Sequence, residues 1–153
     1  MHLASGTIDN YLCTATTAVS TATVIFAATR LRSTVTRERL LKAAAGAAIV
    51  LVAQMFDVPL FGGVVVHPIG AAFLTLLAGP ELALLAMTAV IASQALFMND
   101  GGLAELGANV LNMAVVGVFV AAFALKFTRS RLTGFTGLLV GAALASVLSV
   151  FAA

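Results

Sequence analysis

The chain has 153 residues, of which 61% are hydrophobic and 9% are charged, and its mean hydropathy is +1.12. Soluble domains average about 45–50% apolar and about 25% charged residues. A chain so poor in charge is not a soluble globular enzyme, a disordered segment or a nucleic-acid-binding protein. The composition instead predicts an all-α fold, a polytopic bundle of transmembrane helices.

Six hydrophobic segments follow one another along the chain, and each is a candidate membrane helix. A bilayer core about 30 Å thick needs about 20 mostly apolar residues per helix. The third segment is too short to span alone, so it crosses only if residues 58–66 extend it, or it lies inside the bundle. We expect one membrane domain over residues 1–153, with an extracellular N-terminal segment 1–11 and a bundle over 12–153. The six segments are 12–29, 40–56, 68–78, 82–98, 106–125 and 132–152.

The basic residues orient this bundle. They fall into two clusters, one between the first and second segments and one between the fifth and sixth. Because four segments separate the clusters, both lie on one side of the membrane, and the positive-inside rule makes that side cytoplasmic. The N-terminus and the connections 57–67 and 98–105 are then extracellular. The clusters are Arg30, Arg32, Arg37, Arg39 and Lys42, and then Lys126, Arg129 and Arg131.

This orientation brings His2 and His67, which are far apart in the sequence, to the same outer face. Residues 1–11 lack the basic start of a signal peptide, so we expect Met1 to keep a free α-amine. That amine, the His2 backbone nitrogen and the His2 imidazole Nδ1 can close two chelate rings on Ni(II) or Cu(II), which favour square-planar nitrogen ligands. The fourth nitrogen would come from His67, which precedes Pro68, a residue suited to the first turn of a helix. The residues thus make a transition-metal site possible.

Each of these polar residues also has an ordinary interpretation. A histidine at a chain terminus is often incidental, and one near the end of a membrane helix often makes only an interfacial contact. Asn109 and Asn112 lie three residues apart on one face of the fifth segment, where they either orient a metal ligand or join two helices. The sequence Asp100-Gly101-Gly102 is most simply a turn, although it can close over the site. Packing is the expected role of Cys13, Met55, Met87, Met98 and Met113.

The sequence contains no nucleotide-hydrolysing loop of the form G-x-x-x-x-G-K-[ST]. It also lacks a recognisable arrangement of nucleophile, base and orienting residue. We therefore expect no enzyme activity, and ATP-driven transport would depend on ATPases in other polypeptides.

Several short motifs occur in order across residues 54–117. They are His67-Pro68-Ile69-Gly70, Leu77-Ala78-Gly79-Pro80, Gln94-Ala95-Leu96, Asp100-Gly101-Gly102-Leu103, Leu106-Gly107-Ala108-Asn109 and Asn112-Met113-Ala114-Val115-Val116-Gly117. Together they resemble the substrate-capture subunits of cobalt and nickel energy-coupling-factor (ECF) transporters, the CbiM/NikM family. The opening Met1-His2 also resembles the start of these proteins.

The resemblance implies a substrate-specificity (S) component that captures Ni(II) or Co(II) at the extracellular face for ATP-driven uptake. The amine of Met1, the amide and imidazole of His2 and the imidazole of His67 would bind the ion, with Asn109 among the surrounding polar residues. The implied partners are a transmembrane coupling (T) subunit and two cytoplasmic ATPases, in the cytoplasmic membrane of a bacterium or archaeon. The face of the second segment with Ala44 and Ala48 resembles the surface that meets the coupling subunit, or else it packs within the chain.

Two departures from the family pattern are visible. Ser5 stands where these proteins usually have an acidic residue, and members commonly have a seventh segment. Two rival functions also remain: an S component for an organic micronutrient such as a vitamin, and a structural or assembly membrane protein with incidental histidines. The metal is expected as transported cargo and not as a catalytic cofactor. A planar set of four nitrogens favours nickel over cobalt.

Overall fold

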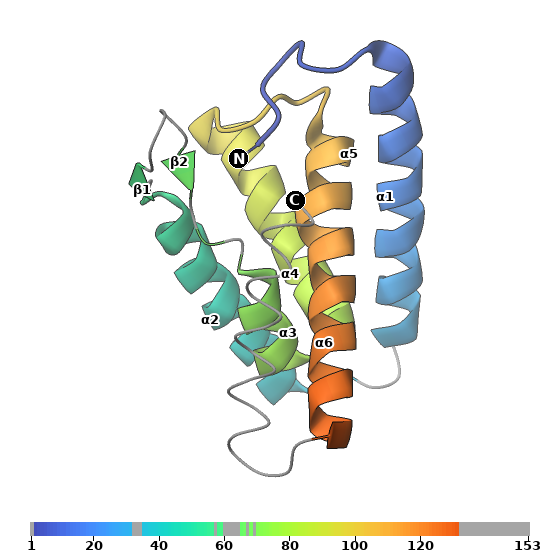
Figure 1. The fold of residues 1–153 in the computed structure, drawn as a ribbon, viewed down its shortest axis with the longest axis vertical. Coiled ribbons are helices and arrows are strands. Elements are labelled where there is room, and N and C mark those ends of the chain that lie inside the picture. Colours follow the sequence, from blue (N-terminus) through green and yellow to red (C-terminus); the bar gives the residue numbers. More distant parts are fainter. Residues whose placement is uncertain are drawn as a thin grey trace.

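The computed structural model describes residues 2–31, 35–56, 58–59, 65–66, 68 and 70–131, with the backbone alone for 58–59, 65–66 and 129–131. Five helical runs and one short hairpin make up this part of the chain (Figure 1). The runs are α1 (Asn10–Leu31); α2 (Arg37–Gln54); α3 (Ala71–Ala78); α4 (Pro80–Ser93) with the π-helix η2 (Gln94–Met98); and α5 (Leu106–Asn109) with the π-helix η3 (Val110–Val116) and α6 (Gly117–Arg131). In the hairpin, β1 (Val58–Pro59) pairs antiparallel with β2 (Val65–Val66), and Val58 lies opposite Val66.

Three of these runs are long and apolar enough to cross a membrane. They are Asn10–Leu31, Pro80–Met98 and Leu106–Thr128. Helices also form over the predicted segment 40–56, as α2, and within 68–78, as α3. The predicted segment 132–152 lies outside the described residues, so the prediction of six segments stays a prediction.

The third segment lies inside the bundle. Its helix has only eight residues, and Ala71, Leu74 and Ala78 on it are buried. Where the structure describes the preceding residues 58–66, they form the two strands and do not lengthen the helix. The prediction that Pro68 occupies the first helical turn is wrong, because α3 begins at Ala71 after Gly70, whose φ of 84° is left-handed. A side chain at Gly70 would also collide with Val50 of α2, within 2.4 Å.

Helix α4 is the centre of the core and contacts α1, α2, α3 and η3. Met87 of α4 and Met113 of η3 are fully buried, as is Ile91. The packing role predicted for these two methionines is therefore confirmed, and Cys13 is also buried. Met55 and Met98 are exposed, so for them the prediction of packing is wrong.

Helix α1 exposes most of its side chains and has many threonines. Their hydroxyls donate to the carbonyls of the preceding turn, as Thr14 does to Asn10 at 2.8 Å and Thr23 to Val19 at 2.8 Å. Because these donors are satisfied within the helix, a threonine-rich segment can face lipid at little cost.

The described residues of both basic clusters lie at the end of the bundle away from the N-terminal segment (Figure 1). The C-terminal ends of α1 and α6 and the N-terminal end of α2 all lie there (Figure 1). Arg39 donates from Nη2 to the Ala78 carbonyl at 2.9 Å, which binds the start of α2 to the end of α3. Lys42 pairs with Glu38 at 2.7 Å.

Candidate functional site

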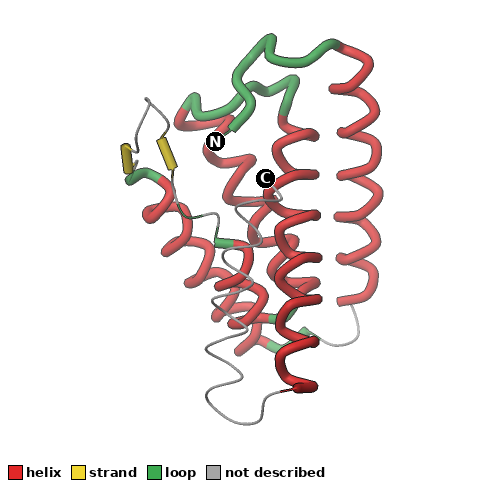
Figure 2. Tube along the Cα trace, in the orientation of Figure 1, coloured by secondary structure: helices red, strands yellow, loops and turns green. Residues whose placement is uncertain are grey.

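The N-terminal segment, residues 2–9, lies across one end of the bundle against the loop 99–105 (Figure 2). Leu3 makes the central contacts. Its N–H donates to Oδ1 of Asn109 at 2.8 Å, and its carbonyl accepts from Nδ2 of Asn109 at 3.2 Å. The same carbonyl accepts from the Gly102 N–H at 2.9 Å. Three hydrogen bonds therefore hold the backbone immediately after His2.

The loop 99–105 passes so close to the N-terminal segment that only small residues fit at the point of contact. Asn99 and Gly101 have positive φ angles, of 54° and 93°. A side chain at Gly101 would lie 3.1 Å from Cβ of His2 and 3.1 Å from Nδ2 of Asn109. Glycine at this position is what lets the loop touch the N-terminal segment, and the turn predicted for Asp100-Gly101-Gly102 does cover residues 2 and 3.

His2 is buried beneath this loop. Its side chain is 1% exposed, and its Nδ1 lies 3.2 Å from Oδ1 of Asp100, which remains half exposed. In many metal sites a carboxylate holds the histidine nitrogen that does not bind the ion, whereas Asp100 faces Nδ1, the nitrogen that the predicted site assigns to the metal. Sequence reasoning placed Asp100 on the outer face but did not pair it with His2.

Of the three predicted metal ligands, the structure describes only His2. Met1 and His67 lie outside the described residues. Within the described part of the chain, no group of three or more His, Cys, Asp or Glu side chains forms a metal site.

The two predicted asparagines differ in position. Asn109 is 2% exposed and bonds to Leu3, so it acts on the backbone next to His2. Asn112 is half-buried in η3, a π-helix that begins directly after Asn109. The expected common face assumed α-helical spacing, and the wider π-turn changes the angle between the two side chains.

Sequence reasoning did not assign a role to Glu105. This residue is 1% exposed, and its Oε1 accepts a hydrogen bond from the Gly6 N–H at 2.6 Å. The contact joins positions 99 residues apart. Neither a motif nor a periodicity marks such a contact in one sequence.

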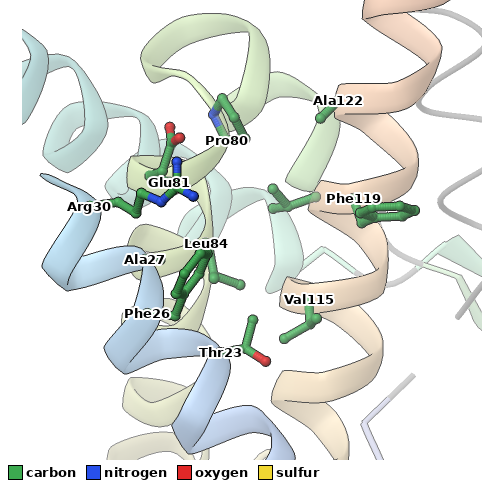
Figure 3. Close-up of a pocket in the computed structure, with 11 residues that line it drawn as sticks. Thr23, Phe26, Ala27, Arg30, Pro80, Glu81, Leu84, Val115, Phe119 and Ala122 are labelled. Atoms are coloured by element: carbon green, nitrogen blue, oxygen red, sulfur yellow. The ribbon is translucent and has the colours of Figure 1, made fainter.

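A cavity of about 360 Å³ lies near the other end of the bundle, between α1, α4 and the run of η3 and α6 (Figure 3). Among the residues that line it, Arg30 and Glu81 are the charged ones, and the Arg30 guanidinium lies 5.0 Å from the centre of the Phe26 ring. The remaining lining is mostly apolar. This cavity therefore offers no nitrogen-rich surroundings for a transition metal and is separate from the contacts of His2.

Comparison with known proteins agrees with the motifs. A family model described as "Cobalt uptake substrate-specific transmembrane region" matches residues 2–153. The chain belongs to the CbiM family. A fused nickel transport protein, NikMN, from Rhodobacter capsulatus is 35% identical over 122 residues, which are 80% of this chain and 35% of that protein. The cobalt transport protein CbiM of Streptococcus sanguinis is 32% identical over 133 residues, 85% of this chain and 54% of that protein.

The fold of this chain also matches a solved structure. The crystal structure of a transition metal transporter superposes with a TM-score of 0.89 at 29% identity, covering 99% of this chain and 66% of that one. The chain spans between 23% and 59% of the length of curated relatives that it matches. It is a membrane component from a family of cobalt and nickel transport proteins, and the relatives are named as transporters and not as enzymes.

Proposed function

We propose that this protein is the substrate-binding S component of an ECF-type uptake system and captures Ni(II) or Co(II) at the extracellular face. The observation that carries the proposal is the contact of the N-terminal segment, residues 2–9, with Asn109 and the loop 99–105. Asn109 and Gly102 hold Leu3, and His2 is buried beside Asp100. Three hydrogen bonds at Leu3 restrict the backbone next to His2, and restricting a binding residue lowers the entropy cost of binding.

The ligands in this proposal are the α-amine of Met1, the backbone nitrogen and Nδ1 of His2, and an imidazole nitrogen of His67. Two fused chelate rings and a fourth nitrogen make a planar set, which favours Ni(II) over Co(II). Because Nδ1 of His2 faces Asp100 at 3.2 Å, the ion would replace this contact when it binds Nδ1.

The partners proposed for this component are a T subunit and two cytoplasmic ATPases, in a bacterial or archaeal cytoplasmic membrane. Ala44 and Ala48 support a docking role for α2, because both are exposed while Ala43, Gly46 and Val50 make up its buried face. Small exposed side chains let another helix approach closely within a bilayer. The protein itself would hydrolyse no nucleotide.

Isothermal titration of the detergent-purified protein with NiCl₂, and separately with CoCl₂, tests the proposal. We expect His67→Ala to weaken Ni(II) binding by more than about a hundredfold, beyond the tenfold to hundredfold that loss of an outer partner causes. A Gly-Ser dipeptide added before Met1 should have a similar effect, because it removes the terminal amine from the site. The matched control carries the same dipeptide after Ala153. Unchanged Ni(II) affinity in either His67→Ala or the N-terminal extension would contradict the proposed ligands.

A further inference from the structure

Glu105 is a buried acid outside the predicted metal site. At 1% exposure it differs from Asp9, Glu38 and Asp100, which are exposed, and from Glu81, which is half-buried. Burying a carboxylate is costly unless hydrogen bonds replace its water. Its Oε1 has such a bond, from the Gly6 N–H at 2.6 Å, while its Oε2 is buried with no hydrogen-bond partner among the described residues. The carboxylate is thus committed to the N-terminal segment.

The backbone around Glu105 is shaped to admit this contact. A side chain at Gly102 would come within 1.9 Å of Oε2 of Glu105 and 2.8 Å of the Ser5 nitrogen. Gly6 has a φ of 81°, a conformation that residues with a side chain rarely adopt. Because Gly102 has no side chain, the Glu105 carboxylate fits beside the N-terminal segment. The left-handed conformation of Gly6 lets its N–H donate to that carboxylate. We refer to Glu105, Gly102 and Gly6 as the loop clasp.

The loop clasp and Asn109 hold different points of the same segment. Asn109 and the Gly102 N–H fix Leu3, the residue after His2, and Glu105 fixes Gly6, three residues further on. With one attachment the segment could pivot about Leu3. With two, the path of the segment between Leu3 and Gly6 is fixed, and with it the position of the backbone next to His2.

We propose that Glu105 is a positioning residue for metal capture, which acts by fixing the N-terminal segment at Gly6 so that Met1 and His2 are held ready for the ion. The proposal rests on the proposed function for its effect on metal affinity, whereas the clasp itself can be tested without metal. The apparent dissociation constant rises in proportion as the competent conformation becomes less populated. A hydrogen bond to a charged group changes such a population by about tenfold or more.

Two measurements on the full-length protein in detergent test this role. Hydrogen–deuterium exchange, read by mass spectrometry on the N-terminal peptide without metal, reports whether the segment is fixed. Titration with NiCl₂ reports whether fixing it matters for capture. The variants are Glu105→Ala, which removes the acceptor, and Glu105→Gln, which keeps an acceptor oxygen and the side-chain size. Glu81→Gln is the matched control, because it makes the same chemical change at the other end of the bundle.

We expect Glu105→Ala to speed exchange in the N-terminal peptide, and to raise the Kd for Ni(II), each by about tenfold. Exchange in α4 should stay as in the unmodified protein, which shows that the bundle remains folded. Glu105→Gln should restore part of both losses, and Glu81→Gln should change neither.

Unchanged N-terminal exchange in Glu105→Ala would overturn the clasp, whatever the metal does. Faster exchange with an unchanged Kd would overturn the positioning role. If the unmodified protein bound no Ni(II) or Co(II), the proposed function would fail, and with it the positioning role, while the exchange data would still decide the clasp.

Discussion

Asn109 is the side chain with the most direct hold on the residue next to His2. Its amide donates to the Leu3 carbonyl and accepts from the Leu3 N–H, at 3.2 and 2.8 Å. Asn109→Ala removes both bonds. The Leu3 carbonyl keeps the bond from the Gly102 N–H, but the Leu3 N–H loses its acceptor on Asn109, so we expect Ni(II) binding to weaken by about tenfold. Titration with NiCl₂ measures this.

Asn109→Asp separates the two bonds of the amide. The aspartate keeps an acceptor for the Leu3 N–H but places an oxygen where Nδ2 faces the Leu3 carbonyl, and two acceptors repel. We expect this variant also to bind Ni(II) more weakly than the unmodified protein. Asn10→Ala, an amide removed from the exposed start of α1, serves as the control. Asn109 variants with unchanged affinity would show that the bonds to Leu3 do not support capture.

At the residue scale, the sequence predicted which side chains can bind a metal, but not which side chains hold the N-terminal segment in place. Imidazoles are recognised by residue type, so His2 was found. Glu105 was not, because its partner is the backbone of Gly6, and any residue but proline carries an N–H.

At the element scale, glycines decide how closely helices approach. A side chain at Gly107 would lie 2.2 Å from Oγ1 and 2.4 Å from Cα of Thr17, so α5 touches the backbone of α1. Ser20 of α1 donates to the Gly107 carbonyl at 2.6 Å in the same contact. A side chain at Gly46 of α2 would instead meet the ends of Leu74 and Leu77, at 2.8 Å.

This difference predicts unequal effects of the same substitution. Gly107→Ala must separate α5 from α1, and we expect a loss of about 3 kcal/mol, the upper part of the range for overpacking. Gly46→Ala should cost less than about 1 kcal/mol, because leucine tips can rotate and alanine favours a helix over glycine by about that amount. A thermal unfolding assay with a thiol-reactive dye, reading the buried Cys13, measures both. Equal melting temperatures for the two variants would contradict the close contact of α1 with α5.

Helix existence was predictable at this scale, whereas helix boundaries were less so. Long apolar runs identified α1, α4 and the run from α5 to α6, because a membrane span needs length and little else. The start of α3 was placed too early, at Pro68, because proline suits a first turn wherever it occurs. The left-handed conformation of Gly70 and its close approach to Val50 of α2 determine where α3 begins. The approach is a tertiary contact, which a local sequence pattern does not predict.

At the scale of the whole molecule, the two ends of the bundle differ in chemistry. One end has the N-terminal segment with His2, Asp100 and Glu105. At the other, Arg39 binds the Ala78 carbonyl, and the ends of α1 and α6 add further bases (Figure 1). The positive-inside rule applied to this arrangement predicts that the basic end faces the cytoplasm and that the N-terminal segment faces outward.

Cysteine labelling in intact cells tests that orientation. In a Cys13→Ala background, Leu103→Cys places a thiol on the loop beside the N-terminal segment, and Val35→Cys places one at the basic end. Leu103 is 59% exposed and Val35 is 42% exposed, so neither substitution disturbs the core. We expect a membrane-impermeant maleimide to label position 103 in intact cells, and position 35 only after the membrane is permeabilised. The Cys13→Ala protein alone gives the background. Labelling of position 35 in intact cells, with position 103 protected, would reverse the orientation and place the N-terminal segment in the cytoplasm, where it could not capture an external ion.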